Sequence, residues 1–324
     1  MYYSFFREKK HFIKAYGGLI LLLSLLVYEV SLSVEFNEWY GAFYNILQKA
    51  TEHSVDEFWN MIIEFSFIAF QMIFAISIAS YLAKHYAFWW REAITFTYMP
   101  IFKSSKYDVE GASQRIQEDT FRFARIVESL GLQIARAILT LIAFIPILYA
   151  LSADIVLPYL RDIDGSLVYV AIAVSIGGIT ISWFVGIKLP GLEYNNQKVE
   201  ASFRKELVYA EDDRDKYADP ETIFELFTGL KVNYKKLFLH YTYFDLWLNL
   251  YNQVMILVPY LLMAPSLFSG TVMLGALTQT GNAFGKVQQS FSIITDNWTT
   301  VTELRSIHKR LKEFEYKLQG KKYP

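Results

Sequence analysis

The chain has 324 residues, of which 53% are hydrophobic and 17% aromatic, and its formal net charge is −1. Apolar residues gathered in stretches of about 20 predict a protein that crosses a bilayer several times. The chain has no cysteine, which excludes disulfides, thiolate metal sites, iron–sulfur clusters and cysteine nucleophiles. The basic residues are segregated by loop and form no patch suited to nucleic acid, so no nucleic-acid partner is expected.

Six membrane spans are predicted in one transmembrane domain that covers residues 1–324. The first begins after a basic start and is followed by no small-residue cleavage site, which favours an uncleaved span over a removed signal peptide. The sixth is the least hydrophobic. The predicted spans are about 15–34, 58–82, 132–151, 167–187, 243–264 and 267–294.

Basic residues predict the orientation of these spans. The loops after spans one and three contain one basic residue each, Lys49 and Arg161, and the loop after span five has none. The N-terminus, the two long connections and the C-terminal tail hold the remaining basic residues that lie outside the spans. Because basic residues collect on the cytoplasmic side, both termini and both long connections are expected there. The composition fits a bacterial inner membrane.

The long connections, residues 84–131 and 188–242, are charged and rich in helix formers. Unstructured loops of that length are uncommon, so spans two to five are expected to continue as helices into the cytoplasm. Turns are expected at Gly111 and near Ala218, with Asp219 capping a helix that begins at Pro220. Six spans with long cytoplasmic helices suggest the membrane domain of an ABC exporter.

A phosphate loop that would bind ATP is not expected. The nearest sequence, Gly281–Val287, has three residues between its glycines instead of four and ends in valine. It also lies in a predicted span and not between a strand and a helix. With no further domain expected after Pro324, the protein would draw on an ion gradient, use a separate ATPase or not pump at all.

A row of acids follows the fourth span. If residues 191–213 form one helix, Glu193, Glu200 and Glu211 lie within ~20° of one another along ~27 Å of its axis. One interpretation is a solvated helix face, on which Glu200 pairs with Arg204. The other is the wall of a water-filled vestibule that conducts protons or cations, which requires the helices to pair through the opposite face, where Tyr209 lies.

Further charged residues are candidates for the same path. Acids precede span three, where pairing with nearby arginines is an equally good interpretation; they are Glu118, Asp119 and Glu128. Charged residues inside the spans are costly in lipid and are expected to face the bundle, a partner or water, with structural ion pairing as the alternative. These are Glu29, Glu64, Arg136, Asp245 and Lys286.

Span six is too polar to face lipid all round and is the best candidate for a pathway lining. Its candidate residues are Gln279, Asn282, Lys286 and Gln289, and polar contact between helices is the alternative interpretation. The five histidines show no metal-binding spacing, and no serine, histidine and acid constellation suggests hydrolysis. No metal, cofactor or enzymatic activity is therefore expected.

Three segments resemble the SbmA/BacA family of bacterial inner-membrane peptide transporters. They are GASQRIQEDTFRFA (111–124), VGIKLPGLEYNNQKVEASFRKELVYAEDD (185–213) and residues 277–311, which include NWTTVTELRSIHKRL. The resemblance implies a homodimer of twelve helices with an ABC-exporter-like membrane fold and no ATPase. It also implies uptake of peptides and peptide-like antibiotics driven by the proton gradient. Longer family members carry extra hydrophobic sequence before the first of these spans.

The same resemblance implies a ladder of glutamates along a central cavity. Matched by position, its members are Glu118, Glu128, Glu193, Glu200, Glu206 and Glu211. Helical spacing favours Glu193, Glu200 and Glu211 and puts Glu206 about 140° away. The function predicted from the sequence is proton-driven peptide import. The alternatives are the membrane subunit of an ATP-driven transporter whose ATPase is a separate chain, and a non-transporting protein that supports envelope assembly.

Overall fold

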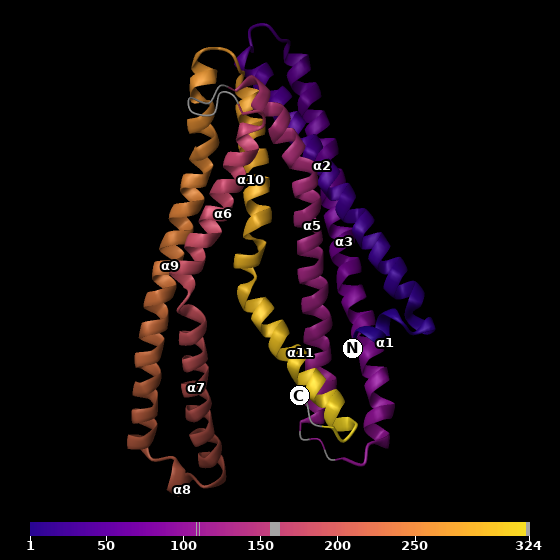
Figure 1. The fold of residues 1–324 in the computed structure, drawn as a ribbon, viewed down its shortest axis with the longest axis vertical. Coiled ribbons are helices and arrows are strands. Elements are labelled where there is room, and N and C mark those ends of the chain that lie inside the picture. The colour runs from indigo at the N-terminus through magenta and orange to yellow at the C-terminus, as the bar shows by residue number, and fades with distance from the viewer. Residues whose placement is uncertain (108, 110, 156–162, 322–324) are drawn as a thin grey trace. The chain divides into compact units, whose positions relative to one another are not determined.

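The computed structural model describes residues 1–107, 109, 111–155 and 163–321, and every element assigned within them is a helix (Figure 1). Arg161 lies outside the described residues. The long helices are α2 (Gly18–Gln48), α3 (Val55–Ser104), α5 (Thr120–Leu151), α6 (Ser166–Gly186), α7 (Leu189–Asp212), α9 (Pro220–Phe268), α10 (Leu274–Asp296) and α11 (Trp298–Leu318). Short helices are α1 (Tyr2–Phe6), α4 (Ala112–Gln114) and α8 (Arg214–Tyr217), and single turns of other helix types cover Lys9–His11, Ile13–Gly17, Arg115–Asp119 and Ser152–Asp154.

Five helical stretches are long and apolar enough to cross a membrane, which defines a multi-pass arrangement. They are Lys9–Gln48, Val55–Ser104, Ala112–Leu151, Ser166–Asp212 and Pro220–Phe268, and they contain the first five predicted spans. Helix α10 is not among them because its composition is more polar, so the sixth span stays a prediction. Its helix begins at Leu274 and not at 267, since α9 continues to Phe268 before the chain turns.

The predicted helical continuation of the spans is confirmed. Helix α3 has 50 residues and is therefore about 75 Å long, far more than the ~30 Å of a bilayer core. Gly111 adopts the left-handed conformation, with φ of 71°, and begins α4. Asp219 accepts a hydrogen bond from the backbone N–H of Thr222 at 3.0 Å, which caps α9 as expected. The cytoplasmic location of these extensions remains a prediction.

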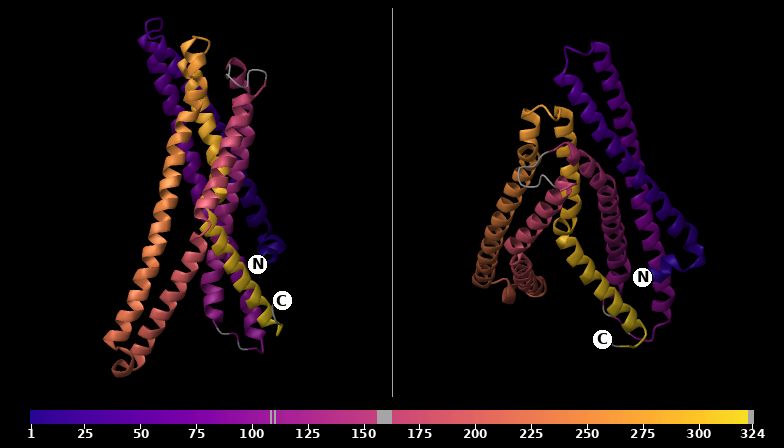
Figure 2. Two further views of the ribbon diagram at one scale, coloured as in Figure 1. Left: turned by 60° about the vertical axis from the view of Figure 1, so that its left-hand side comes forward. Right: turned by 45° about the horizontal axis from the view of Figure 1, so that its top comes forward.

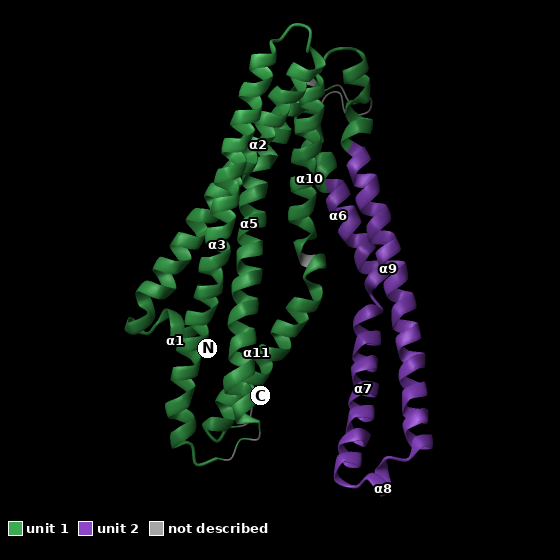
Figure 3. Cartoon of the chain, turned by 180° about the vertical axis from the view of Figure 1, so that it is seen from behind, with its two compact units in different colours: residues 1–172, 259–324 green, residues 173–258 purple. Residues whose placement is uncertain are grey.

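The chain divides into two compact units (Figure 3). Unit 1 comprises residues 1–172 and 259–324, and unit 2 comprises residues 173–258. The division falls inside α6 and α9, so each of these helices contributes to both units. The predicted single domain over 1–324 is not tested by this division and stays a prediction.

In unit 1, α2 and α3 form an antiparallel pair, which can be followed by its colour in Figure 2. Helices α5 and α10 pack against this pair. The core near the chain termini is aromatic. Phe5 of α1 stacks on Trp90 of α3 with ring centroids 5.6 Å apart, and Phe123 of α5 meets the edge of the same indole at 5.9 Å. Helix α11 closes this core with Ile307 and Phe314, both buried. Side chains from four helices thus fix the ends of α3 and α5.

Unit 2 consists of parts of α6 and α9 with α7 and α8. Gly178 of α6 lies directly against the ring of Tyr251 in α9, where a β-carbon would overlap the ring. Such small residues let membrane helices approach closely. The indole N–H of Trp247 donates to the Ser182 hydroxyl at 2.9 Å and adds a polar contact to the same pair. Unit 2 therefore holds α7 on a packed helical hairpin.

Candidate functional site

Helices α5 and α10 of unit 1 line a pocket of about 480 Å³. Its lining is mostly polar: Glu128, Ser129, Leu132, Gln133, Arg136, Ala137 and Thr140 come from α5, and Lys286, Gln289, Ser290 and Ile293 from α10. These positions recur every three or four residues, which places them on one side of each helix. The pocket is therefore encoded as a polar stripe on each of two otherwise apolar helices.

Sequence reasoning identified part of this lining. Lys286 and Gln289 were candidates and lie in the pocket, whereas Gln279 packs against Gly41 of α2, and Asn282 is not among the lining residues. The contact of Gln279 is the interhelical kind expected as the alternative for this span. The polar residues of α5, such as Gln133 and Thr140, were missed. Their spacing within an apolar span was the signal that could have found them.

Arg136 is held in the pocket by a buried acid. Its Nη2 donates to Oε2 of Glu29 in α2 at 2.6 Å. The Glu29 side chain is 6% exposed, whereas that of Arg136 is 51% exposed. A buried carboxylate requires a partner of this kind because its desolvation is costly. For these two span residues the ion-pair interpretation is correct. Oε1 of Glu29 has no hydrogen-bond partner among the described residues.

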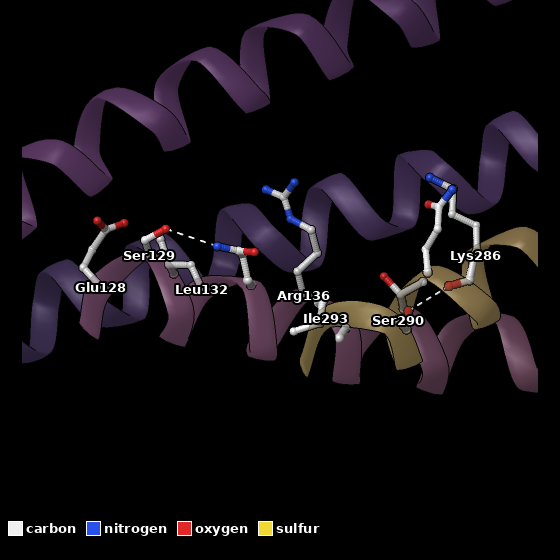
Figure 4. A pocket seen from close by; sticks show the side chains of 11 residues that line it. Glu128, Ser129, Leu132, Arg136, Lys286, Ser290 and Ile293 are labelled. Atoms are coloured by element: carbon white, nitrogen blue, oxygen red, sulfur yellow. Dashed lines mark hydrogen bonds between the residues drawn. The ribbon is translucent and has the colours of Figure 1, made fainter. Parts of the chain in front are cut away.

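The side chains of Arg136 and Lys286 point to the same side of the pocket (Figure 4). The Ser290 hydroxyl donates to the backbone carbonyl of Lys286 at 2.8 Å and is not bonded to the Lys286 ammonium group. Gln133 is also engaged, donating to Ser129 at 3.2 Å and accepting from Asn297 at 3.0 Å. Among the described residues Lys286 has no salt bridge. Of the two cations in the pocket, Arg136 is therefore the one with a salt bridge to another described residue.

Glu128 lies at the other end of the pocket (Figure 4), four residues before the apolar segment 132–151. Its side chain is half-buried. Burial raises the pKa of Glu128 to about 7, although the charge of Arg125 opposes this rise. Removing water disfavours the ionised form of a carboxyl. A group with this pKa exchanges its proton near neutral pH, which an ordinary carboxyl does not.

The two acids before Glu128 have a different environment. Asp119 is buried and accepts from Arg310 at 2.7 and 3.1 Å and from Arg115 at 2.6 Å. Burial alone would raise the pKa of Asp119, but these two arginines outweigh it and hold the pKa below its ordinary value. Glu118 pairs with Arg122 at 3.2 Å and is partly exposed. Glu118 does not line the pocket, and pairing with arginines is correct for both acids.

Four of the predicted ladder residues lie on α7 in unit 2. Glu200 accepts a hydrogen bond from the Tyr234 hydroxyl of α9 at 2.8 Å. Burial and the nearby Glu193 carboxylate raise the pKa of Tyr241, also in α9. Glu193, Glu200 and Glu206 are partly buried, whereas Glu211 is exposed. The spacing argument thus placed Glu193 and Glu200 correctly on one face.

The vestibule interpretation of α7 required pairing through the face opposite the acids. The opposite face is that of Tyr209. Within unit 2 this condition is not met, because Tyr209 is 39% exposed and Phe203, on the acidic side, contacts Phe227 of α9. Glu200 accepts from a hydroxyl of the neighbouring helix, which the sequence pattern of α7 alone did not reveal. Among the described residues, no group of three histidines or acids could hold a metal ion.

The helices and the charged pocket define a multi-pass, all-helical membrane protein. Residues 8–319 match the SbmA/BacA-like family, and the chain belongs to this family.

Curated relatives extend this comparison. The chain is 24% identical to the inner membrane ABC transporter ATP-binding protein YddA of Escherichia coli, over 91% of this chain and 56% of that protein. It is 26% identical to an ABC transporter ATP-binding protein of Synechocystis, over 81% of this chain and 41% of that protein. It is 24% identical to the chloroplastic ABC transporter D family member 2 of Arabidopsis thaliana, over 64% of this chain and 29% of that protein.

These comparisons support a membrane transporter. The chain spans about half the length of YddA and less of the other two relatives.

Proposed function

We propose that this chain imports peptides and peptide-like compounds across a bacterial inner membrane, driven by the proton gradient. Family membership and the five apolar helices support the transport part of this proposal. The proposed assembly is a homodimer, because twelve helices enclose a peptide-sized cavity more readily than six. The orientation that goes with it has both termini in the cytoplasm, as the distribution of basic residues indicates.

The proton coupling depends above all on Glu128. A carrier of protons must load on one side of the membrane and unload on the other, so its pKa must lie between the two pH values. The pKa of Glu128, raised by burial to about 7, meets this requirement. We expect Glu128 to be protonated when it faces the acidic outside and to release its proton toward the cytoplasm.

The other acids of the proposed ladder would share this task. They are Glu118, Glu193, Glu200, Glu206 and Glu211. Carboxyls that interact titrate as a group, so protonation of several would relieve their mutual repulsion and favour an inward-facing state. The tyrosine partner of Glu200 would keep this side chain in place while its charge changes.

Flux measurements in proteoliposomes test the proposal. A labelled peptide should accumulate when a pH gradient, alkaline inside, is imposed, and an uncoupler should abolish the accumulation. Protein-free liposomes under the same gradient are the control for leakage. Accumulation that is equal with and without the gradient would contradict proton coupling.

The second candidate function is the membrane part of an ATP-driven transporter. The names of the relatives favour it, since these relatives are ABC transporter proteins of which this chain spans about half or less. In cells that express the protein, this function predicts peptide uptake that survives an uncoupler and stops when ATP is depleted. The proton-driven function predicts loss of uptake with the uncoupler while ATP is still present.

A further inference from the structure

The pocket between α5 and α10 contains two cations at one end, and among the described residues Lys286 has no salt bridge. Arg136 has five N–H donors, and one of its terminal nitrogens bonds to Glu29 at 2.6 Å. The Arg136 side chain is nevertheless 51% exposed toward the pocket side of α5. Lys286 points to the same side (Figure 4). Charges at this depth are costly, which favours an anionic group between them.

The buried carboxylate of Glu29 holds the Arg136 side chain in a defined position. Glu29 is 6% exposed and its second oxygen has no hydrogen-bond partner among the described residues, so its position is set by packing between helices. The short contact to Glu29 fixes one side of the guanidinium group. The remaining N–H groups are therefore directed in advance, as recognition of a planar carboxylate by arginine requires.

We propose that Arg136 and Lys286 bind the C-terminal carboxylate of the transported peptide; this inference rests on the proposed function and names its substrate class. Arginine offers paired donors that match the two carboxylate oxygens, and the lysine ammonium adds a point charge. The pocket volume of about 480 Å³ lies within the range of small-ligand sites. The neutral polar residues Gln289 and Ser129 complete the lining.

The end of the pocket that contains Glu128 is suited to the N-terminal ammonium group of a peptide. Glu128 precedes Arg136 by eight residues on α5, which corresponds to about 12 Å along the helix axis. An extended tripeptide spans about 10 Å. Its terminal ammonium group can therefore approach Glu128 while its carboxylate lies between Arg136 and Lys286. The substrate class that fits both ends is a short peptide with both termini free.

Binding to the full-length protein in nanodiscs of phosphatidylcholine tests this inference. Trialanine and trialanine amide, which differ only at the C-terminal carboxylate, are titrated calorimetrically. We expect trialanine to bind at least about tenfold more tightly, as befits hydrogen bonds to a charged group. Lys286→Gln should reduce this ratio to about twofold or less. Lys84→Gln, which removes an exposed lysine of α3, is the matched control and should leave the ratio unchanged.

Equal binding of the two peptides, or no binding of either, would overturn the inference, as would an unchanged ratio in Lys286→Gln. Loss of trialanine binding when phosphatidylglycerol is added would assign the pocket to a lipid phosphate and would also overturn it. These outcomes are separate from those of the flux experiment. Gradient-driven flux without carboxylate discrimination contradicts only the inference, and discrimination without flux contradicts only the proposed function.

Discussion

Two charged regions of unit 1 lie on the same stretch of chain and differ in how their charges are satisfied. Around Asp119, two arginines supply three hydrogen bonds to one buried carboxylate. Around Arg136, one buried acid supplies a single contact to a cation that is half exposed, and Lys286 adds a second cation. Only 17 residues separate Asp119 from Arg136.

This difference distinguishes charges that stabilise the fold from charges that are available to bind a ligand. The Asp119 cluster joins α11 to the start of α5 and engages both oxygens of a buried carboxylate, so it stabilises the fold. The Arg136 pocket keeps donors available and an acid that exchanges protons near neutral pH. Charges that are fully satisfied indicate stability, and charges that remain available beside a pocket indicate binding.

Breaking the cluster should have the largest effect. Asp119→Asn leaves Arg310 and Arg115 without their buried partner, so we expect the free energy of unfolding to fall by about 3 kcal/mol. Chemical denaturation in detergent measures it. Glu303→Gln, which breaks only an exposed pair with Arg122, is the control and should cost less than about 1 kcal/mol. Equal effects of the two substitutions would contradict a structural role for the cluster.

The same cluster predicts a loss of stability in acid. Because the arginines hold the pKa of Asp119 below its ordinary value, its contribution is present above that ordinary value of about 3.9 and is lost as the pH falls through the lower folded value. Unfolding measured from neutral to strongly acidic pH should show this loss. Asp119→Asn should lack this part of the pH dependence, and a parallel curve for the variant would show that another group is responsible.

Glu128 should affect transport and not stability. In Glu128→Gln the side chain can no longer release a proton, so we expect gradient-driven uptake to fall at least about tenfold, more than 1.4 kcal/mol in transition-state terms. In the unaltered protein uptake should decline as the external pH rises through about 7, where Glu128 loses its proton. Proteoliposome flux measures both quantities.

Three variants sharpen this test of the ladder. Glu200→Gln and Glu211→Gln should also abolish uptake if the acids act together, whereas Glu225→Gln, which alters an exposed acid of α9, should not. Expression and unfolding of every variant are compared with the unaltered protein. Undiminished uptake in Glu128→Gln, Glu200→Gln and Glu211→Gln would eliminate the proposed coupling.

Removing the buried partner of Arg136 should have a moderate effect on ligand preference. Glu29→Gln removes the negative charge but keeps a side-chain oxygen that can accept from Arg136. The guanidinium group therefore stays oriented, and we expect the preference for trialanine over its amide to increase about threefold, since the pocket becomes more positive. Calorimetry in nanodiscs measures the ratio, and the unfolding curve verifies that the variant is folded. A lower ratio in a folded variant would show that Glu29 mainly orients Arg136.

Glu118 should have the smallest effect on stability. It pairs with Arg122 at a partly exposed site, so Glu118→Gln should change the free energy of unfolding by less than about 1 kcal/mol. Peptide uptake by the Glu118→Gln variant then decides whether Glu118 belongs to the proposed proton path. A stability loss as large as that of Asp119→Asn would place Glu118 in the structural cluster instead.

The pattern of apolar residues and the positions of glycine and proline predicted much of the fold. The first five apolar stretches, the helical continuation of the spans and the turns at Gly111 and Asp219 depend on local sequence and proved correct. The start of the sixth predicted span was misplaced, because hydropathy changes gradually between α9 and α10 whereas the helix break at 269–273 is sharp.

The candidate site was predicted only in part. Spacing placed Glu193 and Glu200 together, since both lie on one helix. It did not predict that tyrosines of α9 would lie beside these two acids. It also did not predict which of the acids Glu118, Asp119 and Glu128 would pair with arginines. Partners such as Arg310 lie 191 residues from Asp119 in the chain, and no periodic pattern connects positions so far apart.

By itself the sequence determined which segments are helical, which are apolar enough for a bilayer and which charges occur on each face, because these depend on neighbours within one or two helical turns. Tertiary structure alone decided which charges meet. Packing of α2, α5 and α10 brings Glu29, Arg136 and Lys286 to one pocket, and packing of α11 satisfies Asp119. The cost of burying a charge depends on its partners and its access to water, and both are set only when distant helices come together.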